Sequence, residues 1–135
     1  MKIATTEHDH QKAVIKWADD MVKFQPKKYW MLEFLYAVPN GARTSRSVAN
    51  RLKAEGMKAG VPDLCLPYTI ELSGQYDIQS EGYGGLFIEM KSKDTKGRLS
   101  DDQKEWIEYL TGQGYKVEVC WSADEAIKVL EDYLG

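Results

Sequence analysis

Cysteine, histidine and long apolar runs are scarce in this sequence, and each scarcity excludes a class of protein. The two cysteines among 135 residues do not form the closely spaced pair that a zinc finger requires. Cys65 and Cys120 each lie inside an apolar run, which favours reduced, buried thiols over a disulfide framework. No stretch approaches the roughly 20 apolar residues that span a bilayer, and the N-terminus turns polar too early for a secretory signal. We therefore expect a cytoplasmic protein without membrane contact.

Net charge is also small, at a formal −3, which argues against a polycation that coats nucleic acid. The charges are nevertheless segregated, because residues 40–60 hold five basic residues against one acid, whereas residues 99–135 hold nine acids against three lysines. A fold that separates these segments would present a basic surface to phosphates, although two ordinary solvated helices give the same pattern. The candidate phosphate contacts are Arg43, Arg46, Arg51, Lys53 and Lys58.

The chain does contain enough apolar material for one compact domain over residues 1–135. Hydrophobic residues make up 43% of it and charged residues 29%, a balance that suits a single globular core of this size. The tryptophans fall in apolar runs and are expected in the core: Trp17, Trp30, Trp106 and Trp121.

Apolar periodicity, capping residues and turn residues predict alternating helices and strands. Helices are expected over residues 7–24 and 45–55, from the Ser100–Gln103 capping box to Gly112 or Gly114, and after Ser122. Strands are expected over residues 30–38, 63–69, 85–92 and 115–121, with a variable hairpin excursion over 71–85. This order predicts an α/β fold, a small mixed β-sheet flanked by helices on both faces.

Three side chains on two of these strands are of the types that cut phosphodiesters. Asp63 begins one strand, and Glu89 and Lys91 lie two apart on the next, so Glu89 and Lys91 share one face. If the two strands pair, Asp63 joins them there. Two neighbouring carboxylates bind Mg²⁺ or Mn²⁺ and leave positions for water and phosphate, and an ammonium offsets charge in the transition state. The combination predicts a metal-dependent nuclease.

A solvated strand edge is the alternative interpretation of Glu89 and Lys91. Phe87 shares their face, however, and the strand lies in the most apolar part of the chain. Helices on both sides of a central strand would bury both charges, which is costly unless they are compensated. A functional site explains this pattern better than a solvated edge.

Polar residues also open the inward face of the first predicted helix. Glu7 and Gln11 lie on the stripe that continues into its apolar face, so they offer the site a further carboxylate and an amide. Glu7 has an alternative role as a first-turn acid favoured by the helix dipole, and Gln103 as part of a capping box. His8 and His10 lie two apart on a helix, where side chains do not face each other, so a solvated turn is their simpler interpretation.

Three spaced motifs run through the chain: GVPD at Gly60–Asp63, FIEMK at Phe87–Lys91, and Ser100 to Gln103 followed by Trp106 and Leu110. Together they resemble the virus-type replication-repair nuclease (VRR-NUC) domain of the PD-(D/E)XK superfamily. The likeness runs from Glu7 to the last helix. It implies a restriction-endonuclease-like core for the predicted sheet.

By this resemblance, Asp63 and Glu89 are the metal-binding carboxylates and Lys91 is the catalytic lysine. The resemblance adds the backbone carbonyl of Met90 and the helix acid Glu7 to the groups that place the metal. Gln11 and Gln103 match the supporting glutamines of the family.

The resemblance also implies an activity and partners. The expected function is a Mg²⁺- or Mn²⁺-dependent DNA endonuclease that selects branched or flapped duplexes such as Holliday junctions, in DNA repair or replication in a bacterium or a phage-infected cell. Short members of the family tend to form homodimers. Two alternatives stay open: a non-catalytic nucleic-acid-binding module with a vestigial acidic site, whose binding is salt-sensitive and needs no metal, and an RNA-directed nuclease of the same fold.

Overall fold

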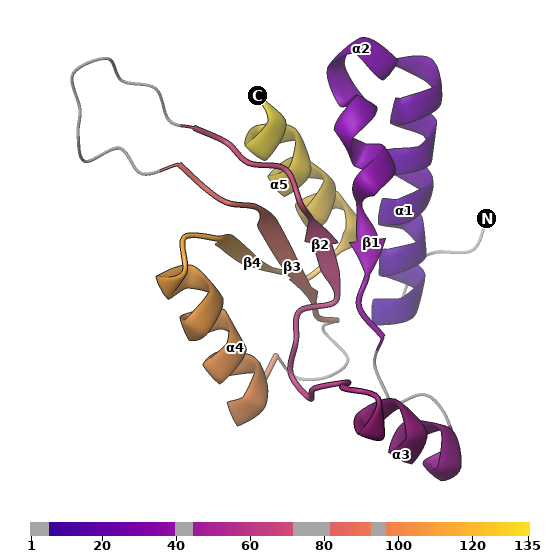
Figure 1. The fold of residues 1–135 in the computed structure, drawn as a ribbon. Helices are drawn as coiled ribbons and strands as arrows, with labels where there is room; N and C mark the ends of the chain where they lie inside the picture. The colour runs from indigo at the N-terminus through magenta and orange to yellow at the C-terminus, as the bar shows by residue number, and fades with distance from the viewer. Residues whose placement is uncertain (1–5, 40–44, 72–81, 93–96) are drawn as a thin grey trace.

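Four strands form one open sheet with the order β1-β2-β3-β4 (Figure 1). The computed structural model describes residues 6–39, 45–71, 82–92 and 97–135. β2 pairs antiparallel with both β1 and β3, whereas β3 and β4 are parallel. The sheet is therefore mixed, as predicted. Its strands are β1 (Tyr36–Ala37), β2 (Leu64–Leu66), β3 (Leu86–Met90) and β4 (Lys116–Cys120).

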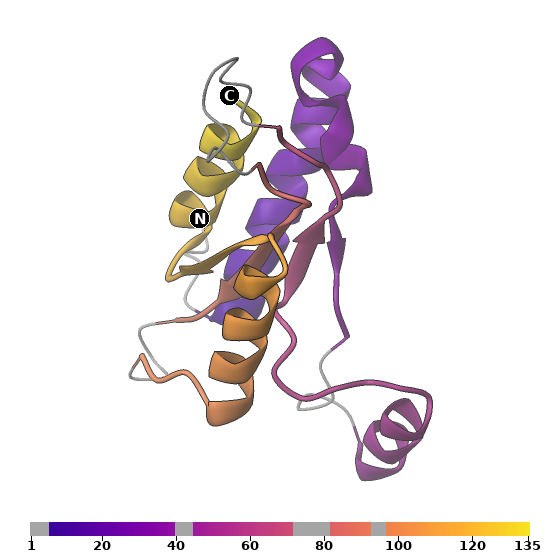
Figure 2. The same cartoon turned by 60° about the vertical axis from the view of Figure 1, so that its left-hand side comes forward.

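Helices cover both faces of this sheet. α1 (Glu7–Phe24) and α5 (Ala123–Leu134) pack on one face, and α4 (Asp101–Gly112) lies on the other (Figures 1 and 2). α4 is also the crossover that a parallel pair such as β3 and β4 requires. The predicted α/β architecture with helices on both faces is thus confirmed.

Three shorter elements complete the described chain. α2 (Pro26–Tyr29) and the 3₁₀-helix η1 (Trp30–Phe34) lead from α1 to β1, and α3 (Arg46–Ala54) lies at one end of the molecule (Figure 1). Within the part of the chain that the structure describes, no helix has the length and apolar character needed to cross a membrane.

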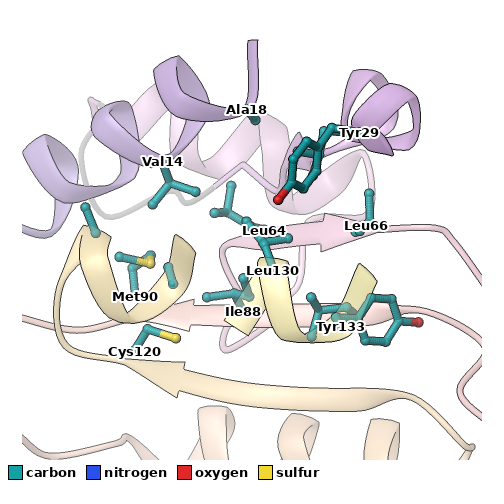
Figure 3. Close-up of a cluster of buried hydrophobic side chains, with 14 residues drawn as sticks. Val14, Ala18, Tyr29, Leu64, Leu66, Ile88, Met90, Cys120, Leu130 and Tyr133 are labelled. Carbon is teal, nitrogen blue, oxygen red and sulfur yellow. The ribbon is translucent and has the colours of Figure 1, made fainter. Parts of the chain in front are cut away.

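The hydrophobic core lies between the sheet and the α1–α5 pair (Figure 3). Each fully buried aliphatic side chain stabilises such a core by about 1.5–3 kcal/mol. Because strand side chains alternate, the core face of β3 leaves Phe87, Glu89 and Lys91 on the α4 face, as predicted. The core includes Val14, Ala18, Leu64, Leu66, Leu86, Ile88, Met90, Cys120 and Leu130. Both cysteines are free and buried, as expected.

Side-chain caps determine where the long helices begin. The Thr6 hydroxyl accepts a 3.0 Å hydrogen bond from the Asp9 N–H at the start of α1, and the Ser122 hydroxyl accepts a 3.1 Å bond from the Glu125 N–H at the start of α5. Ser45 caps α3 in the same way. These bonds satisfy backbone donors that a helix leaves open. The four predicted helices are confirmed to within two residues at these ends.

The expected strand over residues 30–38 is wrong. Pro26 suits a first helical position and begins α2, and the chain continues as η1 before the two-residue β1. Tyr29, Met31 and Leu32 are buried while Phe34 is exposed, which is not the alternation of a strand. Periodicity does not separate short apolar runs of helix and strand.

Two other expectations need adjustment. Of the four tryptophans expected in the core, Trp17 packs against it, whereas Trp106 and Trp121 are half-buried outside the core cluster. Trp30 is 50% exposed, with its ring edge-on to Tyr68 at a centroid distance of 5.9 Å. β2 is shorter than the predicted strand over 63–69, because Pro67 has no N–H for the ladder. Ile70 and Tyr83 form the base of the expected hairpin excursion, of which residues 72–81 lie outside the described residues.

Candidate active site

Asp63 and Glu89 meet at the end of the two central strands where β2 begins and β3 ends. The antiparallel register pairs Leu64 with Ile88, so Asp63 lies opposite Glu89 on the face that carries α4. Asp63 Oδ2 also accepts a 2.7 Å hydrogen bond from the Met90 N–H. The structure therefore brings the two carboxylates together where the strand pattern predicted them.

Burial dominates the electrostatics of this carboxylate pair. Glu89 is 3% exposed, and burial together with the charge of Asp63 raises the pKa of Glu89 to about 8. Burial raises the pKa of Asp63 as well, against the lowering effect of the Met90 N–H. A hydrogen bond between the carboxyl groups raises the pKa of Glu89 and lowers that of Asp63. The pair therefore holds a proton on Glu89, in the place where a cation would relieve the same repulsion.

Lys91 brings a positive charge to this pair. Its side chain is 8% exposed, and its backbone N–H donates a 2.8 Å hydrogen bond to the Cys120 carbonyl, which extends the β3–β4 pairing. Its charge lowers the pKa of both Asp63 and Glu89. The ammonium of Lys91 therefore acts electrostatically on both carboxyl groups.

Gln103 links the helix cap of α4 to Glu89. Its Oε1 accepts a 2.9 Å hydrogen bond from the Ser100 N–H, while its Nε2 donates a 2.8 Å bond to Glu89 Oε1. The Ser100 hydroxyl completes the predicted capping box through the Gln103 N–H at 3.1 Å. Gln103 therefore fills both roles considered for it: its amide oxygen caps the helix, and its amide nitrogen supports Glu89.

Gly60 explains how the segment before Asp63 packs against α4. Its φ is +90°, and a Cβ built there would lie 2.5 Å from the backbone carbonyl carbon of Asp102. Only glycine combines this conformation with so close an approach. The GVPD segment is thereby held beside the first turn of α4, which carries Gln103.

Glu7 and Gln11 reach the same region from α1. Together with His8 and Asp63 they line a hollow of about 300 Å³. The charge of Glu7 raises the pKa of both Asp63 and Glu89, which places its carboxylate near the pair. The structure therefore gathers all three acids expected from the sequence.

The basic candidates divide into three groups. Lys53 and Lys58 line a second hollow of about 280 Å³, on whose wall Asp63, Glu89 and Gln103 also lie. Arg46 and Arg51 are exposed on α3 and do not line that hollow. Arg43 lies outside the described residues.

The two histidines have different surroundings, which the sequence did not indicate. His10 Nδ1 accepts a 3.0 Å hydrogen bond from the Ala123 N–H at the start of α5, so it joins α1 to α5. His8 lines the hollow with Glu7 and Asp63. The one signal in the sequence for the place of His8 is that it lies next to Glu7 and about one helical turn before Gln11.

The donor set of the site fits a hard divalent cation. In the described part of the chain, no group of three or more His, Cys, Asp or Glu side chains is arranged to hold an ion by itself. Mg²⁺ needs fewer, because it keeps waters and binds through one or two carboxylates and substrate phosphate. Asp63 and Glu89 are such a pair, and the raised pKa of Glu89, caused by burial and by the charge of Asp63, is in keeping with a place where added positive charge is favourable.

Comparisons with known proteins bear on the family and the fold of this chain. The family model described as the VRR-NUC domain matches residues 5–124. A solved structure described as a VRR_NUC domain protein is 27% identical, with a TM-score of 0.70, and the alignment covers 98% of this chain and 90% of that one. No curated protein matches this chain.

Proposed function

The chain belongs to the VRR-NUC domain family, which is a family of nucleases, and from this premise we propose that it hydrolyses phosphodiester bonds in DNA with Mg²⁺ or Mn²⁺. The observation that carries the proposal is the pair formed by half-buried Asp63 and buried Glu89, with the charge of buried Lys91 acting on both. Burying the charged groups of Glu89 and Lys91 is costly unless they serve a site.

Asp63 and Glu89 are the side chains that would hold the metal, and the family resemblance adds Glu7 and the Met90 carbonyl. A bound divalent cation supplies a water of lowered pKa and neutralises charge on the phosphate. The chain itself orients the ligands, because the Met90 N–H holds Asp63 and the Gln103 amide holds Glu89. Hydrogen bonds of this kind keep metal ligands in position before the ion arrives.

Lys91 is the residue proposed to act on the reacting phosphate. An ammonium offers three N–H donors, enough to bind a non-bridging phosphate oxygen and the attacking water together. Negative charge builds on the phosphate oxygens in the transition state, and a fixed cation in a buried site stabilises it more than water does. The proposed mechanism therefore assigns ligand binding to the carboxylates and charge stabilisation to Lys91.

Branched or flapped duplexes such as Holliday junctions are the proposed substrates, and a homodimer is the proposed assembly. Both proposals come from the resemblance to the family. The exposed lysines beside the carboxylates support a phosphate-bearing substrate. A pair of sites in a dimer would also suit a substrate with two strands to cut.

Cleavage assays with Lys91→Ala test the proposed function. We expect the unaltered protein to cut branched DNA in Mn²⁺ or Mg²⁺, EDTA to stop it, and Lys91→Ala to lose cleavage with an unchanged circular dichroism spectrum. Lys128→Ala is the matched control, since Lys128 is an exposed lysine of α5.

Three outcomes would contradict the proposal in different ways. Full activity in Lys91→Ala would overturn the mechanism. Salt-sensitive DNA binding without cleavage in any metal would favour the non-catalytic module. Faster cleavage of a matched RNA junction than of the DNA junction would favour the RNA-directed alternative.

A further inference from the structure

α3 stands apart from the sheet and the other helices, at the end of the molecule where β2 begins and β3 ends (Figures 1 and 2). None of its residues is buried. A nine-residue helix that is not part of the core needs another reason for its position. Its charge supplies one, because its basic side chains Arg46, Arg51 and Lys53 are all exposed.

Helical geometry divides these basic residues between two faces. Lys53 lines the hollow that contains Asp63 and Glu89. Arg46 precedes Lys53 by seven residues, almost two full turns, so it lies on nearly the same side of α3. Arg51 is two residues from Lys53, which places it roughly 160° away around the helix.

Lys58 adds to the face that Lys53 presents. It lies in the turn after α3 and lines the same hollow. Lys53 and Lys58 therefore lie beside the carboxylate pair, and Arg46 continues the face of α3 that carries Lys53. Along the axis of α3, Arg46 and Lys53 are separated by roughly 10 Å, or about three nucleotides of one strand of duplex DNA.

We propose that Arg46, Lys53 and Lys58 form a phosphate-binding row that holds the DNA backbone on one side of the bond to be cut. Arg51 is not part of this row. The proposal rests on the proposed function, and it goes further by separating basic residues that the sequence could not distinguish.

The row would counter the electrostatic repulsion between the acidic site and the DNA backbone. Asp63 and Glu7 bring negative charge to the centre of the site, Glu89 adds to it once it releases its proton, and this charge repels an approaching phosphate. Cations beside that centre offset the repulsion and attract the backbone, with counterion release as the source of affinity. The hollow beside Glu7 has a described lining of two acids, one histidine, one amide and apolar residues. Among the described residues that line these two hollows, lysines occur only on the side of α3, which is the side where we place the DNA backbone.

DNA-binding measurements test the row without depending on cleavage. The probe is a labelled branched duplex in Mg²⁺, and the variants are Lys53→Glu, Arg51→Glu and Lys128→Glu, each in a Lys91→Ala background. Arg51→Glu places the same charge change in the same turn of α3, and Lys128→Glu changes a distant exposed lysine. Circular dichroism checks that α3 and the fold are retained.

We expect Lys53→Glu to weaken binding about tenfold and to reduce the salt dependence by about one counterion. Arg51→Glu should cause a clearly smaller loss, and Lys128→Glu none. In cleavage by the protein with Lys91 intact, shortening the DNA on one side of the cut should lower kcat/KM more than shortening it on the other.

The proposed row would be refuted if Lys53→Glu and Arg51→Glu lost DNA affinity equally. It would also be refuted if the salt dependence of binding were unchanged in Lys53→Glu. Equal sensitivity to shortening on both sides would overturn its one-sidedness. Row-dependent binding without metal-dependent cleavage would instead refute the proposed function and leave the row standing, so the two failures are distinguishable.

Discussion

Glu89 is the residue on which most of the site's interactions converge. It pairs with Asp63, accepts from Gln103 and lies near Lys91 and Glu7. The balance of these contacts favours the protonated form, since burial and the neighbouring acids outweigh the lysine. Because of Glu89, the free energy of unfolding should therefore depend on both pH and bound metal.

Metal-free protein should lose stability between about pH 4.5 and pH 8. The pKa of Glu89 is about 8 in the folded protein against 4.5 as its ordinary value, so over this range the folded state binds a proton that the unfolded chain has released. The free energy of unfolding falls as pH rises through such a window. Since a tenfold change in proton affinity is worth about 1.4 kcal/mol, we expect a loss of a few kcal/mol.

Urea unfolding in EDTA at several pH values measures this loss. Glu89→Gln should flatten the profile, because an amide does not titrate, and Mg²⁺ should restore the stability of the unaltered protein at pH 8. An equally steep profile in Glu89→Gln would assign the pH dependence to other groups.

Gln103 offers a second prediction at this scale, because its two ends do different things. Gln103→Glu keeps an acceptor for the Ser100 N–H but replaces the donor to Glu89 with another acid. Ser100→Ala removes the hydroxyl cap and leaves the Gln103 amide. We expect Gln103→Glu to lower cleavage by roughly tenfold or more, as expected when a metal ligand loses its orienting partner. Ser100→Ala should cost about 1 kcal/mol of stability with little effect on cleavage.

Cleavage rates and urea unfolding of the two variants separate these effects. If Ser100→Ala lost as much activity as Gln103→Glu, Gln103 would act only through the helix end. If neither variant lost activity, the bond from Gln103 to Glu89 would have no part in the reaction.

At the scale of elements, sequence prediction succeeds where a local signal is unambiguous. The capping residues Thr6, Ser100 and Ser122 mark helix starts, and the alternation in β3 places Glu89 and Lys91 on the face away from the core. Predicting that Asp63 and Glu89 lie together required one further assumption, that their two strands pair. These local patterns carried most of the fold and the centre of the site.

Prediction failed where long-range packing decided the outcome. The apolar segment after Pro26 packs against α1 as α2 and η1, so Trp30 is exposed while its neighbour Met31 is buried. The bond from His10 to the start of α5 joins residues far apart in the chain. Which basic residues face the hollow depends likewise on how α3 is oriented.

Gly60 shows how one turn positions two elements, and Gly56 provides its control. Both have positive φ, at +90° and +112°, but a Cβ at Gly56 meets nothing within 4 Å, whereas at Gly60 it meets the backbone of Asp102. Gly56→Ala should cost about 1 kcal/mol through backbone conformation alone. Gly60→Ala should cost several kcal/mol, because α4 must also shift.

Urea unfolding of the two variants checks this difference, and cleavage by Gly60→Ala checks its consequence. A displaced α4 carries Gln103 away from Glu89, so the surviving folded protein should cut more slowly. Equal destabilisation by the two substitutions would show that the turn tolerates a side chain against α4.

In the described part of the molecule, three of the five exposed large apolar side chains lie on η1 and β1, and the other two are Phe24 on α1 and Tyr109 on α4. Trp30, Phe34 and Tyr36 are 50%, 56% and 51% exposed on η1 and β1. Edge strands and apolar patches are places where chains associate. The proposed homodimer would bury this patch and leave the hollows beside Asp63 open to DNA, because none of the three aromatics lines them.

Light scattering coupled to size-exclusion chromatography should then give twice the mass of one chain at micromolar concentration.

Phe34→Ser should raise the dimer dissociation constant by roughly tenfold or more, as expected for the loss of a buried aromatic anchor. Tyr109→Ser is the matched control, because Tyr109 is similarly exposed, at 54%, but lies on α4 and not on η1 or β1. A chain that stays monomeric at every concentration would refute the dimer, and equal weakening by Tyr109→Ser would place the interface on α4 instead. Because the proposed phosphate-binding row lies on and just after α3, and not on η1 or β1, Phe34→Ser should keep single-strand nicking and lose paired cuts in one junction.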